Sequence, residues 1–262
     1  MLDLLHSMSN VSLAFLLAIL LVGFSWFGAL FIRPFFQLWL RGQRRRNALI
    51  GYTLSSFSLF YGLMLGLLSL ATYSNSEDVG NSVKVEASNL ATLYRDVSHY
   101  PGHIRYFLQD QIKNSTLYTI EEVWPAQQQG EAAKYDYVIV TSILDSLMTF
   151  QPSSKAEEIL HAETLQRFNA LIESRQLRQA GADKKIPLVL WFVVAVGAMI
   201  NIGLFWMFDM KFSMHIILGG SVAFFLSMMI LIIVATDAPL RGDVSVPPGA
   251  YEKVLRNLSL ME

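Results

Sequence analysis

The pattern most capable of function lies in an uncharged stretch between residues 48 and 71. Small residues recur there at steps of three and four, which places them on one face of a helix; they are Gly51, Ser55, Ser58, Gly62, Gly66 and Ser69. The face could pack against another helix, because glycines four residues apart let two backbones approach closely. It could instead line a pore, where low bulk and hydroxyls leave room for water and ions. Both interpretations hold if the packing lies between subunits around a central axis.

Two aromatic residues in the same stretch, Phe57 and Phe60, are candidate gates. A pore that narrows at apolar side chains can close by losing its water, without a charged gate. Since no charged residue lies in the stretch, selectivity would depend on hydroxyl and backbone dipoles. Conduction of this kind is passive and needs no proton gradient.

The motifs of common enzymes are missing. The chain contains no Gly-x-Ser-x-Gly, no His-Glu-x-x-His, no phosphate loop and no dinucleotide fingerprint. It also contains no cysteine, which excludes disulfides, thiolate metal sites and a cysteine nucleophile. His99 and His103 have the spacing of helical metal ligands, but Pro101-Gly102 interrupts the helix between them. We therefore expect no enzymatic activity, no cofactor and no metal site.

Four apolar blocks are long enough to cross a bilayer, whose core of about 30 Å needs roughly 20 helical residues. They are residues 11–32, 48–71, 186–208 and 212–235. In lipid every backbone N–H and C=O must be bonded within its own segment, so these blocks are helices. The chain is 53% hydrophobic with a formal net charge of −1, so we expect a lipid bilayer around it and no nucleic-acid partner.

Charged residues are absent from the interiors of the four blocks, whereas proton relays and ion-coupled transporters usually carry one at membrane depth. The strongly polar exceptions are Asn201 and His215. We expect Asn201 to form a hydrogen bond between helices. His215 lies near the end of its span, where an interfacial position or a pH-sensing role remains open.

The predicted fold is all-α: a polytopic membrane protein with four transmembrane helices and a helical soluble region between helices two and three. Residues 1–72 form an N-terminal hairpin, 73–185 the extramembrane region, 186–235 a C-terminal hairpin and 236–262 a tail. The third and fourth spans are joined only by Asp209-Met210-Lys211, which requires them to be antiparallel.

The extramembrane region is predicted to contain four helices. The first begins after an N-cap at Ser76 and ends at Pro101-Gly102, where the second begins. Residues 124–134 are predicted to be a loop, and a third helix ends at Pro152. Ser154 with Glu157 forms a capping box for a fourth helix that leads into the third span.

The connection between the first two spans, residues 33–47, is rich in arginine: Arg33, Arg41, Arg44, Arg45 and Arg46. Short loops of this kind normally stay in the cytoplasm, so we expect this loop to lie inside. Basic residues also precede the third span, on the opposite side, but residues of long loops count for less.

Several short motifs, in their order along the chain, resemble a bacterial and plant family called bestrophin-like. Glu86-Ala87-Ser88-Asn89-Leu90 with Leu93-Tyr94-Arg95 resembles its signature, and Glu122-Val123-Trp124-Pro125 resembles its Glu-Trp-Pro element with a valine inserted. Arg175 and Arg178 precede the third span and Trp191 lies within it. Asp237-Ala238-Pro239-Leu240-Arg241-Gly242 follows the fourth.

The family is named for its remote likeness to bestrophins, which are pentameric anion channels with four spans per subunit. The resemblance therefore implies a similar architecture for this chain. Bestrophins keep both termini and the inter-span region in the cytoplasm, the reverse of the orientation that the arginines favour. No run of residues here aligns to the bestrophin pore-neck motif. We expect the polar residues of the signature to be structural: Glu86 could pair with Arg95, and Asp237 could turn the chain or pair with Arg175 or Arg178.

Two hypotheses follow. In the first, the chain is a homo-oligomer that conducts small ions passively, with residues 48–71 around the axis. In the second, it is a non-conducting membrane scaffold or sensor whose helical extramembrane region binds a partner. The stripe of small residues fits either one.

Overall fold

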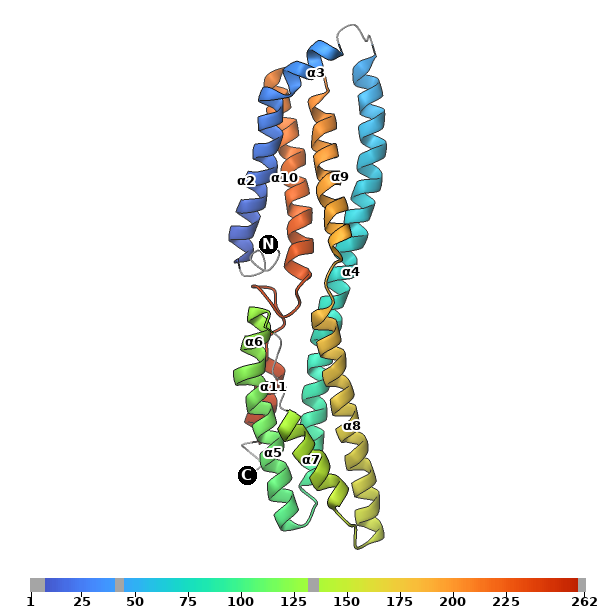
Figure 1. The fold of residues 1–262 in the computed structure, drawn as a ribbon, viewed down its shortest axis with the longest axis vertical. Coiled ribbons are helices and arrows are strands. Elements are labelled where there is room, and N and C mark those ends of the chain that lie inside the picture. Colours follow the sequence, from blue (N-terminus) through green and yellow to red (C-terminus); the bar gives the residue numbers. More distant parts are fainter. Residues whose placement is uncertain (1–7, 41–44, 132–136, 259–262) are drawn as a thin grey trace. The chain divides into compact units, whose positions relative to one another are not determined.

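The computed structural model describes residues 8–40, 45–131 and 137–258, and these contain helices and no strand (Figure 1). They divide into two compact units. Unit 1 runs to Ser74 and resumes from Lys185 to Ala238, with residues 242–244; unit 2 holds Asn75–Lys184, residues 239–241 and the chain from Ser245 onward. The predicted boundaries were 72/73 and 185/186. Two of the loop arginines, Arg41 and Arg44, lie outside the described residues.

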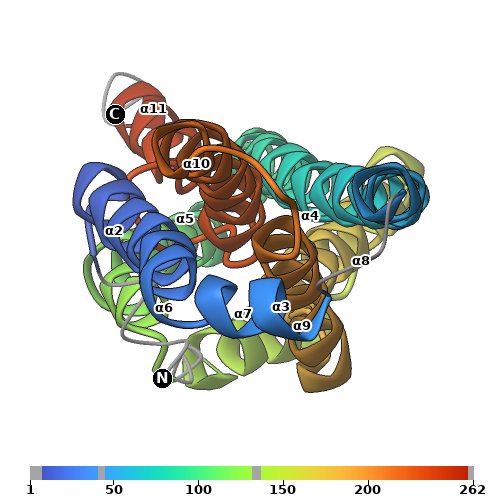
Figure 2. The same cartoon turned by 90° about the horizontal axis from the view of Figure 1, so that it is seen from above.

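Unit 1 contains the four predicted membrane spans. Helix α2 (Asn10–Phe31) leads through α3 (Arg33–Trp39) to α4 (Arg46–Val97), and α9 (Leu188–Trp206) forms a hairpin with α10 (Phe212–Thr236). All four long helices are apolar enough to cross a membrane. Helices α2 and α10 lie side by side in both views (Figures 1 and 2). The predicted fold class, a four-span all-α membrane protein, is confirmed.

The core of unit 1 depends on aromatic rings that fit against glycines. The indole of Trp206 occupies the space that a side chain at Gly28 would need, and its Nε1 donates to the Ser25 carbonyl oxygen at 3.0 Å. Tyr61 fills the space beside Gly197 and donates to the Val194 carbonyl oxygen at 2.7 Å. Each large ring therefore satisfies its polar atom with a backbone carbonyl of another helix, as an apolar environment requires.

Helix α4 does not end at residue 71. It continues without a break to Val97, so Ser76 lies inside the helix and its prediction as an N-cap is wrong. No proline interrupts residues 72–78, and the apolar series at Val79, Val83 and Leu90 is fully buried in unit 2. Packing of that series outweighs the weak helix propensity of the Ser-Asn-Ser segment before it.

Unit 2 is a helical bundle. The second half of α4 is joined there by α5 (Gly102–Tyr118), η1 (Thr119–Val123), α6 (Trp124–Gln129), α7 (Tyr137–Thr149), α8 (Lys155–Asp183) and α11 (Gly249–Leu258). Its core gathers apolar residues from all of these α-helices, and α6 contributes Trp124.

The helix boundaries observed in unit 2 agree in part with those predicted from the sequence. Ser154 Oγ accepts from the Glu157 amide at 3.2 Å, so the predicted N-cap is confirmed. The return bond of the predicted capping box is shifted by one residue, because the Glu157 carboxylate accepts from the Ser153 amide. The predicted loop at 124–134 is wrong for its described part, because α6 begins at Trp124 with Pro125 in its first turn and ends at Gly130, whose φ is +76°. Helix α8 ends at Asp183, because Pro187 disfavours helix before it.

The glycine contacts of unit 1 give a test of the core. Gly28→Leu should lower the free energy of unfolding by about 1–3 kcal/mol, because the added side chain overlaps the Trp206 indole. Gly23→Leu on the same helix is the matched control, since a side chain there meets nothing within 4 Å. Thermal unfolding in detergent measures both, and equal midpoints for the two variants would contradict this packing.

Candidate functional site

The stripe of small residues lies on a face of α4 that its own chain leaves largely uncovered. A side chain added at Gly51, Gly62 or Gly66 would meet no atom within 4 Å. Ser55 is exposed, and Ser58 borders the bundle, where its hydroxyl donates to Asn201 Oδ1 at 3.3 Å. Asn201 therefore makes the expected bond between helices. The close helix contacts inside unit 1 use Gly28 and Gly197 instead, which the sequence did not single out.

The opposite sides of α4 differ in how far the rest of the chain buries them. Tyr61 and Leu65 face the bundle and are buried. Leu59 and Leu63 each lie two residues from Tyr61, which is about 160° around a helix of 100° per residue. Both are exposed, at 70% and 60%, so they form the side of α4 that points away from its own bundle.

The two candidate gates occupy different positions. Phe57 is half-buried and its ring stacks on Tyr61, with centroids 6.0 Å apart, so it belongs to the packing of unit 1. Phe60 is 71% exposed and lies about 160° around the helix from Gly62. Phe60 and the stripe are therefore opposite flanks of α4 and cannot both face one narrow lumen.

The connections at one end of unit 1 bind each other through polar groups. Arg46 Nη2 lies 2.6 Å from Asp209 Oδ2, and Asn47 exchanges two hydrogen bonds with the backbone of Asp209, at 2.8 and 2.9 Å. Arg33 donates to the Met210 carbonyl oxygen. His215, early in α10, is buried, and its ring lies 5.5 Å from that of Phe205. At least two of the five loop arginines thus hold the hairpin ends together.

Unit 2 contains a buried ionic centre. The carboxylate of Glu86 on α4 accepts from Arg175 Nε at 2.9 Å and from Arg178 Nε at 2.7 Å, both on α8. Glu86 is fully buried and the arginines are 7% and 1% exposed. Burial by itself raises the pKa of Glu86, but the two guanidiniums outweigh it, so that the pKa lies below its ordinary value of 4.5. Glu86 is therefore ionised at neutral pH.

Glu86 does not pair with Arg95, and that prediction is wrong. Nine residues correspond to about 900° of helix, which places the two side chains on opposite faces of α4. Arg95 is exposed, whereas its predicted partner points toward α8.

Further family-signature residues surround the ionic centre. Asn89 donates to the Ala170 carbonyl oxygen at 3.2 Å and to Ser174 Oγ at 3.3 Å, one turn along α4 from Glu86. The Trp124 ring lies 5.5 Å from the guanidinium carbon of Arg178, a cation–π contact. Arg178 also donates to Gln127 Oε1 at 2.9 Å, which ties α6 to α8.

The remaining signature residues have local roles. Asp237 Oδ1 accepts from the Ile186 amide at 2.9 Å, just before α9. Gly242 has a φ of +78°, a conformation that glycine adopts without strain. Trp191 lies half-buried in unit 1, and Tyr94 is buried in unit 2.

Sequence reasoning missed Tyr251. This residue of α11 is fully buried, its ring lies 5.6 Å from that of Trp124, and burial, then the nearby Glu86 carboxylate, raises the pKa of its phenol well above the ordinary value. Tyr251, Val254 and Leu258 are three and four residues apart, which is the spacing of one helix face. This spacing could have predicted α11 from the sequence.

The ionic centre gives a test with a defined pH dependence. Glu86→Gln leaves two buried guanidiniums without this carboxylate, so it should cost about 3 kcal/mol or more near neutral pH. Because the pKa of Glu86 is lowered by folding, its stabilisation is present above about pH 4.5 and is lost as pH falls below that value. Unfolding measured from pH 3 to 7 should show the variant and wild type converge in acid. A deficit no larger than that of the exposed control Glu121→Gln would contradict the assignment.

The chain matches known proteins by family and by fold. The model of the Bestrophin-like domain family matches residues 5–251. Among solved structures, a bacterial bestrophin homologue from Klebsiella pneumoniae, in a tyrosine-to-alanine variant, has a TM-score of 0.70 at 13% identity over 93% of this chain and 98% of that chain. A leucine-to-threonine variant of the Klebsiella homologue has a TM-score of 0.63 at 14% identity over 97% and 99%.

A proline-to-alanine variant of a membrane protein also has a TM-score of 0.63, at 14% identity over 97% of this chain and 99% of that chain. Identity this low shows a shared fold, and no curated protein matches the sequence. The family match covers nearly the whole chain, and the described helices have the four apolar spans of a membrane protein. This integral membrane protein therefore belongs to the Bestrophin-like domain family.

Proposed function

We propose that the protein is a homo-oligomeric channel that conducts small anions passively, with α4 around the central axis. The observation that carries the proposal is the exposure of α4. In its apolar window only 11% of the residues are buried by the chain, against 28–33% for the other three spans. The family resemblance to bestrophins, which conduct anions, supports the same function.

We infer that the path does not run through one subunit. The centre of unit 1 is filled by a cluster of buried apolar residues, and the glycines that would leave space, Gly28 and Gly197, are occupied by rings. A wetted path would therefore run between copies. Because a ring needs at least three copies to enclose an axis, we propose an oligomer of three or more subunits.

The sides of α4 fit such a ring. Tyr61 faces its own bundle, so Leu59 and Leu63 on the far side would face the axis. The two flanks have complementary bulk, with Gly62 and Gly66 on one and exposed Phe60 on the other. Small residues on one copy could receive large residues of the next, which is a head-to-tail contact of the kind that closes a ring.

In this arrangement the gate is formed by other residues than the two phenylalanines predicted from the sequence. Phe57 packs inside the subunit and Phe60 lies on a flank, so the narrowest part of the lumen would be formed by Leu59 and Leu63. Rings of leucine can stop conduction by losing water. Residues 47–74 contain no charged side chain, so we expect weak selectivity, with some potassium passing beside chloride.

Flux through liposomes tests conduction. Purified protein in vesicles should release chloride under a gradient without a pH difference, and Leu63→Ser should increase the rate severalfold, because a hydroxyl lowers the barrier to wetting. Leu20→Ser on exposed α2 is the matched control and should leave the rate unchanged. A well-folded oligomer that passes neither chloride nor potassium across a range of pH and calcium would favour the scaffold or sensor instead.

We also propose a bacterial inner-membrane location with residues 33–47 on the cytoplasmic side. The arginine count supports this side. Part of that signal has a structural use, because Arg46 pairs with Asp209 and Arg33 with Met210. All five arginines still count toward this side, because the rule counts Lys and Arg residues and not net charge. The bestrophin resemblance implies the reverse orientation.

Single cysteines in this cysteine-free chain test the orientation. Gln43→Cys, outside the described residues, should resist an impermeant thiol reagent in intact cells, whereas Gln128→Cys on exposed α6 should react. Permeabilised cells provide the control in which both react. Labelling of Gln43→Cys alone in intact cells would establish the bestrophin orientation.

A further inference from the structure

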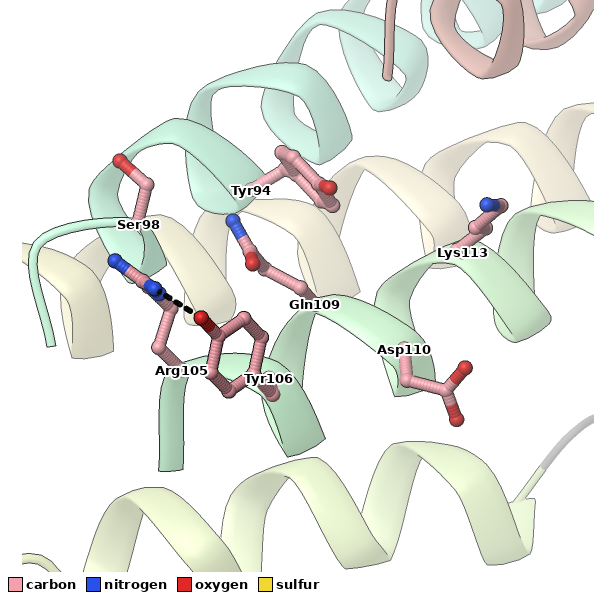
Figure 3. Close-up of a pocket in the computed structure, with 7 residues that line it drawn as sticks. All are labelled: Tyr94, Ser98, Arg105, Tyr106, Gln109, Asp110 and Lys113. Carbon is pink, nitrogen blue, oxygen red and sulfur yellow. Dashed lines mark hydrogen bonds between the residues drawn. The ribbon is translucent and has the colours of Figure 1, made fainter. Parts of the chain in front are cut away.

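Unit 2 contains a hollow of about 520 Å³ that neither the ionic centre nor α4 in the membrane explains. It lies between the last turns of α4 and the first turns of α5 (Figure 3). Its lining residues are Tyr94, Ser98, Arg105, Tyr106, Gln109, Asp110 and Lys113. The volume is within the range of small-molecule sites, which is roughly 300–1,000 Å³.

The guanidinium of Arg105 brings a positive charge to the hollow, and the neutral side chain of Tyr106 holds it in place. Arg105 Nη2 donates to the Tyr106 hydroxyl at 2.8 Å, and the guanidinium carbon lies 4.6 Å from the centre of the Tyr106 ring. Arg105 has no ion pair with a carboxylate in the described part of the chain. Stacking fixes the orientation of the fork while its other N–H groups stay available for an anion.

A second group with unused hydrogen bonds lies beside it. Residues 105 and 109 are one helical turn apart and so share a face of α5. Figure 3 shows the Gln109 amide directed toward α4, between Ser98 and Tyr94. Within the residues that the structure describes, this half-buried amide makes no hydrogen bond, so it can offer both a donor and an acceptor.

The other walls restrict the ligand. The buried ring of Tyr94 and the exposed ring of Tyr106 provide apolar surface. Asp110, whose carboxylate accepts from Asn114 Nδ2 at 3.0 Å, and Lys113 line the same hollow and bring charges of opposite sign to it. A planar carboxylate satisfies the Arg105 fork with two oxygens.

We propose that this hollow binds a small carboxylate-bearing molecule, whose carboxylate pairs with Arg105 and whose body lies against Tyr94, with Gln109 bonding its polar groups. Such a site is separate from the proposed conduction path. Its occupancy is measured without any ion flux, so its failure would leave the channel proposal untouched.

Benzoate is a suitable probe, because it combines a carboxylate with a flat ring. Calorimetric titration of the full chain in detergent, at constant ionic strength, should show saturable binding of one benzoate per subunit. Arg105→Gln should weaken binding about tenfold or more, because it removes a charge-assisted pair. Arg105→Lys should give an intermediate loss, since the charge remains without the fork.

Two further variants secure the interpretation. Gln109→Leu removes the amide without changing charge and should weaken binding about threefold. Lys84→Gln, an exposed cation of α4 outside the hollow, should bind as wild type does. Absence of benzoate binding to wild type, or equal affinity in the Arg105→Gln and Lys84→Gln variants, would overturn the site. Inorganic phosphate that binds more tightly than benzoate would overturn the carboxylate assignment.

Discussion

Hydrocarbon offers no hydrogen bonds, and this constraint shapes unit 1 from its helices to its exposed face. The indoles of Trp26 and Trp206 and the phenol of Tyr61 each donate to a backbone carbonyl of another helix. These bonds fix how α2, α4, α9 and α10 meet. These contacts leave one flank of α4 uncovered, where the glycines and Ser55 lie. A surface of that composition gains little from lipid tails, which is why a neighbouring copy and a wet axis suit it better.

In unit 2 the main constraint is on charge. A charged side chain that is buried away from water has to be neutralised by a partner of opposite charge. Glu86 receives Arg175 and Arg178, and the aromatic rings of Trp124 and Tyr251 close over the same centre. Four helices (α4, α6, α8 and α11) thus meet at one carboxylate. A buried ion pair contributes less to stability than its Coulomb attraction suggests, but it penalises any other register of the helices strongly. The centre therefore specifies how unit 2 packs.

Sequence reasoning succeeded where a single local rule decides. Bilayer thickness sets the length of the spans, and the N-cap at Ser154 follows from a four-residue signal. It failed where distant packing decides: Ser76 is a good cap locally, yet the buried series from Val79 carries the helix through it. The partners of Glu86 lie 89 and 92 residues away, beyond any periodicity, and helix geometry alone was enough to exclude Arg95. For the stripe, the sequence identified the face but not its neighbours, because these would belong to another chain.

The central claim is that copies of the chain form a ring in which the small flank of α4 meets the large flank of the next copy. Disulfide linkage in the cysteine-free background measures this most directly. Within one chain, positions 60 and 62 point about 160° apart and cannot pair. The double variant Phe60→Cys with Gly62→Cys should therefore give a ladder of linked copies under mild oxidation, whereas each single variant should stay unlinked. Linkage of a single variant into dimers as readily as the double variant, or a double variant that remains monomeric, would contradict the ring.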